Sequence, residues 1–153
     1  MSVQDHGGRQ SGDMTTNHRP RPLTRERSRG EIEAAVCEAV SRFQQNYMGR
    51  GPRRAIARLV EDTLFIRLDG VLSAAEQRLV DVKAADHGRG AEIVRQFRSH
   101  LISLARPLLE AVVHEITGAF TLNLHHDLSL DSGAEVIVFT LATVPECRGR
   151  HHR

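Results

Sequence analysis

The chain has 153 residues, a formal net charge of +2, 40% hydrophobic residues and 26% charged residues. This length is typical of a single domain, and the composition is near that of ordinary soluble domains. The sequence has no apolar run near the roughly 20 residues that cross a bilayer, and its start is polar where a signal peptide is apolar. We therefore expect a cytoplasmic protein without a transmembrane segment, which could bind peripherally at a membrane.

Both ends of the chain are basic. Residues 1–29 and 145–153 together hold nine arginines against four acidic residues. Residues 1–28 have few large apolar side chains, so burial cannot offset the entropy of ordering them. We predict a disordered basic tail over 1–28, a single domain over 29–144, and a flexible, His-rich basic tail over 145–153. No aromatic residue interleaves these arginines, which argues against nucleic acid as a partner.

The first predicted helix begins near Glu31. Its apolar residues follow helical spacing and form one stripe, namely Ile32, Ala35, Val36, Ala39, Val40, Phe43 and Tyr47. Gly49 is expected to end this helix. Two short strands follow, Ala55–Val60 and Leu64–Leu68, and the Glu61-Asp62 pair between them predicts a tight antiparallel hairpin.

Two more helical patterns come next. Ser73 and Glu76 have the spacing of a capping box, which predicts a second helix that ends near Ala85. The longest pattern then has apolar residues at steps of three or four, at Ile93, Phe97, Leu101, Leu104, Leu108, Val112 and Ile116. Pro107 interrupts this pattern, so the sequence predicts either one kinked helix or two helices that meet near Arg106. Gly118 is expected to end it.

Two further strands are predicted before the C-terminal tail. Phe120, Leu122 and Leu124 alternate with polar residues in the third strand, and residues 127–133 are expected to join it to the fourth, Val136–Leu141. The fourth strand is apolar on both faces, which indicates a central position or a covered second face. The predicted fold is α+β with the order αββααββ and a four-stranded, mainly antiparallel sheet with helices packed on one face. An apolar outer face could be the interface of a homodimer.

The turn after the first helix is a candidate site for binding an anion or a partner. Glycines let backbone N–H groups approach a phosphate, and nearby arginines supply charge; the residues are Gly49, Arg50, Gly51, Pro52, Arg53 and Arg54. Known phosphate loops lead from a strand into a helix, whereas this turn leads out of a helix. The alternative interpretation is a helix stop with exposed arginines.

His125, His126 and Asp127 are a candidate polar loop site. On a strand, His125 and Asp127 would share one face and His126 would point to the other, so at most two could bind one ion. A zinc site needs three or four ligands, so we predict no metal site and interpret the three residues as polar residues entering a hairpin loop. Cys37 and Cys147 have no metal or redox spacing and are expected to be reduced thiols. We predict no catalytic residues and no cofactor.

Several motifs together resemble one family. They are Tyr47–Pro52, Arg67–Glu76, Ala105–Pro107, Glu115–Gly118, His125–Asp127 and Glu135–Leu141. Their order and spacing are similar to those of the MpsC-like family, named for the C component of a sodium-translocating system that generates membrane potential. The resemblance covers about residues 31–143 and implies a small soluble bacterial protein, associated in some members with membrane transport of cations and inorganic carbon. It implies no catalytic residue, and it marks residues 49–52 and 125–127 as candidate functional positions.

Three functions follow as hypotheses. The leading one is a non-enzymatic accessory or regulatory module that binds subunits of a membrane transport complex and forms a homodimer. The alternative is a sensor of a small anion or nucleotide that uses the turn at 49–52 with Arg53 and Arg54. The third is weak, salt-dependent binding of nucleic acid through the basic tails.

Overall fold

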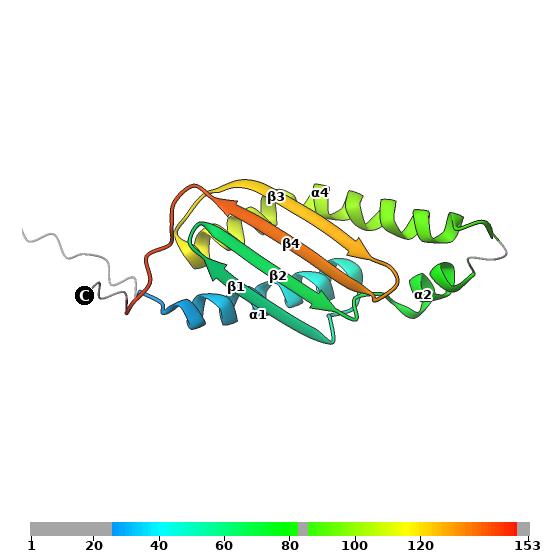
Figure 1. The fold of residues 1–153 in the computed structure, drawn as a ribbon, viewed down its shortest axis with the longest axis horizontal. Helices are drawn as coiled ribbons and strands as arrows, with labels where there is room; N and C mark the ends of the chain where they lie inside the picture. The colour runs from blue at the N-terminus through cyan, green and yellow to red at the C-terminus, as the bar shows by residue number, and fades with distance from the viewer. Residues whose placement is uncertain (1–25, 83–85, 150–153) are drawn as a thin grey trace, which may run out of the picture.

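Four antiparallel strands form one sheet in the computed structural model, which describes residues 26–82 and 86–149 (Figure 1). In chain order the elements are α1 (Arg29–Met48), β1 (Arg54–Val60), β2 (Thr63–Asp69), α2 (Ala74–Asp81), α4 (Arg89–Thr117), β3 (Thr121–Ser129) and β4 (Ala134–Leu141). The strands lie in the order β1-β2-β4-β3, and each neighbouring pair is antiparallel. The predicted α+β class, element order and antiparallel sheet are confirmed.

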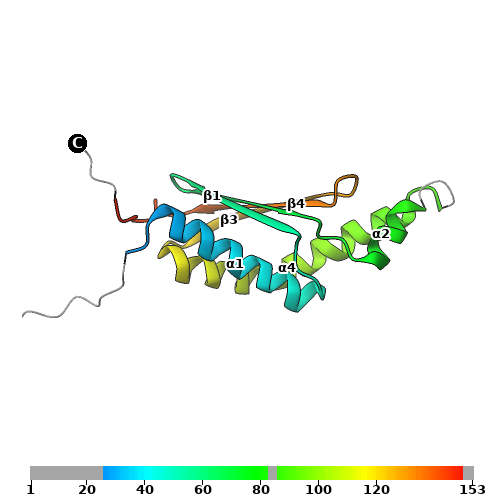
Figure 2. The same ribbon diagram turned by 90° about the horizontal axis from the view of Figure 1, so that it is seen from below.

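α1 and α4 cover one face of the sheet (Figure 2). α1 packs against β1 and α4 packs against β3, and the two helices also contact each other. Side chains of the strands alternate between this covered face and the open one, so Leu64, Ile66 and Leu68 of β2 are buried while Phe65 is exposed. β4 pairs with both β2 and β3, which confirms the central position that its two apolar faces indicated.

Local sequence signals set the bounds of α1. Ser28 caps the helix: its Oγ accepts a hydrogen bond from the Glu31 backbone N–H at 3.2 Å, and Glu31 Oε2 accepts from the Ser28 N–H at 2.7 Å. The helix therefore starts two residues before Glu31, where the prediction began it. Gly49 ends it in the left-handed conformation, with φ of 75°, as predicted.

The β1–β2 hairpin and the capped start of α2 are as predicted. Val60 pairs with Thr63, so Glu61 and Asp62 form a two-residue turn, and Glu61 takes a positive φ of 53°. At α2, Ser73 makes the same reciprocal bonds with Glu76 that Ser28 makes with Glu31. These elements form where the sequence signals place them because the bonds join residues close in the chain.

α4 is one helix of 29 residues that continues through Pro107, so of the two predicted alternatives the single helix is observed. Its buried side is the series Gly90, Val94, Arg98, Ile102, Ala105, Leu109, Val113 and Thr117. Most of the apolar pattern that predicted the helix lies on a different side and is exposed, including Ile93 and Leu104. The helix is thus apolar on a wider sector than the sheet covers.

β3 differs from the prediction in length and in alternation. The strand runs to Ser129, so residues 127–129 belong to it and not to the connecting loop. Thr121 pairs with Leu141 and Asn123 pairs with Thr140, which leaves Leu122 as the extra residue of a β-bulge. Phe120, Leu122 and Leu124 were expected on one face of the strand. Because of the bulge, Phe120 and Leu122 are exposed, whereas Leu124 packs against the core.

Most residues of the two predicted tails lie outside the described residues, so disorder there stays a prediction. Among the described ones, the Arg148 backbone N–H donates to the Arg27 carbonyl oxygen at 3.0 Å, and the Arg148 guanidinium lies 3.4 Å from Glu31 Oε2. The segments before α1 and after β4 therefore lie side by side. Within the described parts of the chain, no helix is long and apolar enough to cross a membrane.

Candidate functional site

The turn between α1 and β1 is held by a side chain of α1. Gly51 donates its backbone N–H to Gln45 Oε1 at 2.9 Å, and Gln45 Nε2 donates to the Gly49 carbonyl oxygen at 3.3 Å. Gln45 thus bridges both glycines. A backbone donor that a bound anion would need is already satisfied here, and the turn closes the helix C-terminus.

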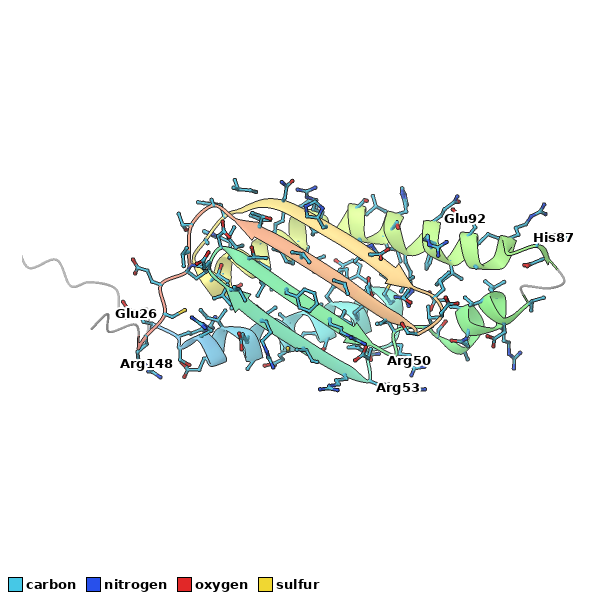
Figure 3. All side chains as sticks on the ribbon, in the orientation of Figure 1. Glu26, Arg50, Arg53, His87, Glu92 and Arg148 are labelled. Carbon is cyan, nitrogen blue, oxygen red and sulfur yellow. The ribbon has the colours of Figure 1, made fainter. Side chains whose placement is uncertain are left out.

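The three arginines of the turn have different surroundings. Arg50 is partly buried and donates through Nη1 to the Leu72 carbonyl oxygen at 3.3 Å, so it ties the turn to the segment before α2. Arg53 is exposed, and its aliphatic stem covers Gly70, where an added Cβ would lie 2.7 Å from Arg53 Cγ. Arg54 begins β1 opposite Asp69. Figure 3 shows Arg50 and Arg53 near the start of β1.

His125, His126 and Asp127 lie in β3, which corrects their interpretation as loop residues. The predicted division between faces holds: His125 and Asp127 are exposed on the open face of the sheet, while His126 points toward the helices. His126 Nε2 lies 2.6 Å from Glu135 Oε1 in the neighbouring strand β4. In the described residues, no group of three or more His, Cys, Asp or Glu is arranged to hold a metal ion.

His126 belongs to a buried polar cluster that joins five elements. We define this cluster as Gln44 of α1, Glu76 of α2, Arg98 of α4, His126 of β3 and Glu135 of β4. The side chain of Arg98 is 1% exposed and that of Glu135 is 0% exposed. Charged side chains are almost never so deeply buried unless they are paired, so the stability of the cluster depends on the partner of each polar atom.

Arg98 is the centre of the cluster. Its Nε donates to Glu76 Oε1 at 2.8 Å, and its Nη2 donates both to Glu76 Oε2 at 2.9 Å and to the Val71 carbonyl oxygen at 2.6 Å. This is the two-point contact that a planar guanidinium makes with a carboxylate. Nη1 lies 3.5 Å from Glu135 Oε2, an ion-pair distance without hydrogen-bond geometry. Arg98 therefore links α4 to the start of α2 and to the central strand.

Glu135 receives the remaining contacts. Gln44 Nε2 donates to its Oε2 at 2.8 Å, and His126 Nε2 faces its Oε1 at 2.6 Å. Gln44 Oε1 and Arg98 Nη1 have no hydrogen-bond partner among the described atoms. The central strand is thus fixed to α1, α4 and β3 through one side chain.

The pKa of Glu76 reflects its place at the rim of the cluster. Burial of the carboxylate acts to raise its pKa, but the hydrogen bonds from Arg98 and from Ser73 and the charge of Arg98 outweigh burial, and the pKa is lowered from its usual value. Glu76 therefore stays ionised through the neutral range. The same carboxylate closes the capping box of α2 and neutralises Arg98.

The polar side chains of the cluster interact mainly with one another and are mostly buried. Its acidic and basic groups pair with one another, Arg98 also donates to the Val71 carbonyl oxygen, and the side chains of Glu76 and His126 are 14% and 9% exposed. We interpret the cluster as a structural lock between the helices and the sheet.

Part of the cluster has a signal in the sequence. Every second residue of a strand faces the same side, so Glu135 lies on the buried face of β4 with Ile137, Phe139 and Leu141. The sequence-based prediction did not include this buried carboxylate. Glu76, His126 and Glu135 each lie in a motif that carries the family resemblance. Gln44 and Arg98 lie outside those motifs, and only the folded chain brings them to Glu135.

Cys37 and Cys147 are free, as expected. Burial raises the pKa of the Cys37 thiol, which leaves it less reactive than an exposed cysteine. Cys147 Sγ lies 3.6 Å from the Pro145 carbonyl oxygen.

Comparison with known proteins gives one family. Residues 28–143 match the model of the family described as Na+-translocating membrane potential-generating system (MpsC). The chain is also 29% identical over 115 residues to the Bacillus subtilis (strain 168) protein called uncharacterized protein YbcI, which covers 75% of this chain and 89% of that protein. No solved structure matches the chain significantly.

Proposed function

The chain belongs to the MpsC family, and on that premise we propose that it is a non-enzymatic accessory protein of a membrane system for cation transport. It would bind as a homodimer at the cytoplasmic side of the membrane complex, peripherally, and act by contact with other subunits. The open face of the sheet is the surface that we assign to this contact.

The composition of the open face supports a protein partner. Its central row runs across the four strands from Arg58 through Phe65 and Val138 to His125. The adjacent row, similarly, holds Ile56, Arg67, Val136 and Asp127. Phe65 and Val138 thus lie between Arg58 and His125, and Val136 lies between Arg67 and Asp127. Phe65, at the centre, is 37% exposed. An aromatic anchor within a polar rim is typical of protein interfaces.

The burial of the titratable cluster supports a role without catalysis. The inner face of the sheet holds Glu135, which is fully buried, and His126, whose side chain is 9% exposed, whereas Arg58, Arg67 and Asp127 are exposed on the open face. The observation that carries the proposal is therefore the contrast between a sealed inner face and an open outer face with an aromatic centre, in a chain of this family.

Co-purification tests the proposal directly. The tagged full chain is expressed in the organism that encodes it, membranes are extracted in mild detergent, and the proteins that co-purify are identified. We expect subunits of a cation-transport complex with the wild-type chain, and their loss with Phe65→Glu. Leu79→Glu is the matched control because Leu79 is exposed on α2, in the other layer. Recovery of the wild-type chain without such subunits would contradict the proposal.

A further inference from the structure

The exposed side of α4 carries large apolar residues in a regular order. Ile93 is 51% exposed, Phe97 is 53%, Leu104 is 66% and Leu108 is 44%. Leu101 and Val112, which are partly buried, continue the same side. We call these six residues the outer stripe of α4. A surface helix of a monomer normally presents polar residues there, so an apolar sector wider than the one that packs on the core indicates a second contact.

The spacing within the outer stripe is symmetric. From Ile93 to Val112 the steps are four, four, three, four and four residues. Two copies of such a helix that cross antiparallel about a two-fold axis place Ile93 against Val112, Phe97 against Leu108, and Leu101 against Leu104. An isologous interface requires this self-complementarity, in which each residue contacts a residue whose own partner is the first. The pattern thus points to a second copy of this chain.

The surroundings of the outer stripe differ at its two ends in a way that fits this pairing. Toward the C-terminus of α4, Leu108 and Val112 line an apolar groove whose other wall is α1, with Phe43 and Tyr47. Toward the N-terminus, α4 continues past the end of α1 (Figure 2), and this end of the helix carries Ile93 and Phe97, which are both about half exposed. Antiparallel pairing inserts the protruding end of each copy into the groove of the other.

Charge complementarity favours the same register. Arg89 at the start of α4 and Glu115 near its end are both exposed. In the antiparallel register Arg89 of one copy lies level with residue 116 of the other, next to Glu115, and the two-fold axis repeats the contact. Opposite charges at both ends oppose a parallel arrangement, in which like charges would meet.

We propose that two copies of this chain dimerise through the outer stripes of α4, in antiparallel register, with Ile93 and Phe97 of each copy in the α1–α4 groove of the other. This inference rests on the homodimer included in the proposed function, and it assigns the dimer interface to the outer stripe of α4. It leaves the open face of the sheet available for the membrane partner.

Light scattering after size exclusion, on the full chain, tests the inference. The wild-type chain is expected to have the mass of a dimer, and Leu104→Glu the mass of a monomer with an unchanged circular dichroism spectrum. Val60→Glu is the matched control: Val60 is 65% exposed on the open face of the sheet, close to the 66% of Leu104, and this variant stays dimeric.

Each outcome decides a separate point. A wild-type chain that is monomeric at tens of micromolar overturns the homodimer itself. A dimer that Leu104→Glu leaves intact and Val60→Glu dissociates overturns only the assignment to α4 and places the interface on the sheet. If Leu104→Glu unfolds, Phe97→Ser serves as the second variant, with the same expected mass.

Discussion

The two sides of α4 each carry residues that are unusual for their surroundings. The inner side buries Arg98 completely, whereas the outer side exposes Ile93, Phe97 and Leu104. The buried charge is matched by Glu76 and Glu135 of the same chain, so the inner side is complete. The exposed apolar side has no such complement in the described residues. The contrast separates what holds this fold together from what it offers to another molecule.

The largest expected effect concerns the inner side. Arg98→Met keeps an unbranched apolar side chain but removes the guanidinium, which leaves the carboxylates of Glu76 and Glu135 buried without their cation. We expect the free energy of unfolding to fall by about 3–5 kcal/mol, because removal of one partner leaves an uncompensated buried charge. Urea denaturation measures this change.

The matched control for Arg98→Met lies on the same helix. Arg95→Met removes an arginine whose side chain is 50% exposed and which pairs with Glu92 at the surface. Its effect on the free energy of unfolding should stay within about 0.5 kcal/mol. Equal effects of the two substitutions would mean that the buried cluster does not stabilise the packing of the helices on the sheet.

A smaller effect is expected from acid. The pKa of Glu76 is lowered in the folded chain by its hydrogen bonds with Arg98 and Ser73, although burial opposes this. The unfolded chain thus binds the proton more tightly. The contribution of Glu76 to stability is complete above about pH 4.3, the usual glutamate pKa, and is lost as the pH falls through the lower folded value.

Denaturation at several pH values checks this sign. Between about pH 5 and pH 2, unfolding free energy should depend less steeply on pH in Glu76→Gln than in the wild-type chain. Glu110→Gln, which removes a surface partner of Arg106, should leave the slope nearly unchanged. An equal slope in all three proteins would mean that Glu76 does not cause the loss of stability in acid.

The smallest expected effect is at the turn. Arg50 donates a long hydrogen bond to Leu72, so Arg50→Ala should lower the free energy of unfolding by about 1 kcal/mol or less. The anion-sensor hypothesis predicts a different result: phosphate, nucleotides or bicarbonate raise the Tm of the wild-type chain, and Arg50→Ala abolishes this rise. By differential scanning fluorimetry we expect no rise of Tm in either protein. A rise of Tm confined to the wild-type chain would support the anion-sensor hypothesis.

The sequence predicted those features that depend on neighbouring residues. The end of α1 at Gly49, the two-residue turn at Glu61 and the cap of α2 by Ser73 follow from bonds within a few positions of the chain. The pattern of Ser73 and Glu76 occurs also at Ser28 and Glu31, so the start of α1 was predictable by the same rule.

Features that depend on distant contacts were predicted less well. The apolar pattern of α4 predicts a helix but not which side packs on the sheet, because a second apolar series runs beside the first. The bulge at Leu122 arises from pairing with β4, which local alternation does not reveal. Likewise the bond between Gln44 and Glu135 joins residues 91 positions apart. Such contacts exist only once the sheet order is known.

Disulfide trapping tests most directly whether the outer stripe of α4 joins two copies of the chain in antiparallel register. The variant carries Ile93→Cys with Val112→Cys, in a chain whose Cys37 and Cys147 are replaced by alanine, and is oxidised mildly. We expect a disulfide-linked dimer for this double variant and none for either single variant, because equivalent residues would lie about 28 Å apart along the helix pair. Absence of the linked dimer, or equal linkage in the single variants, would contradict the antiparallel dimer.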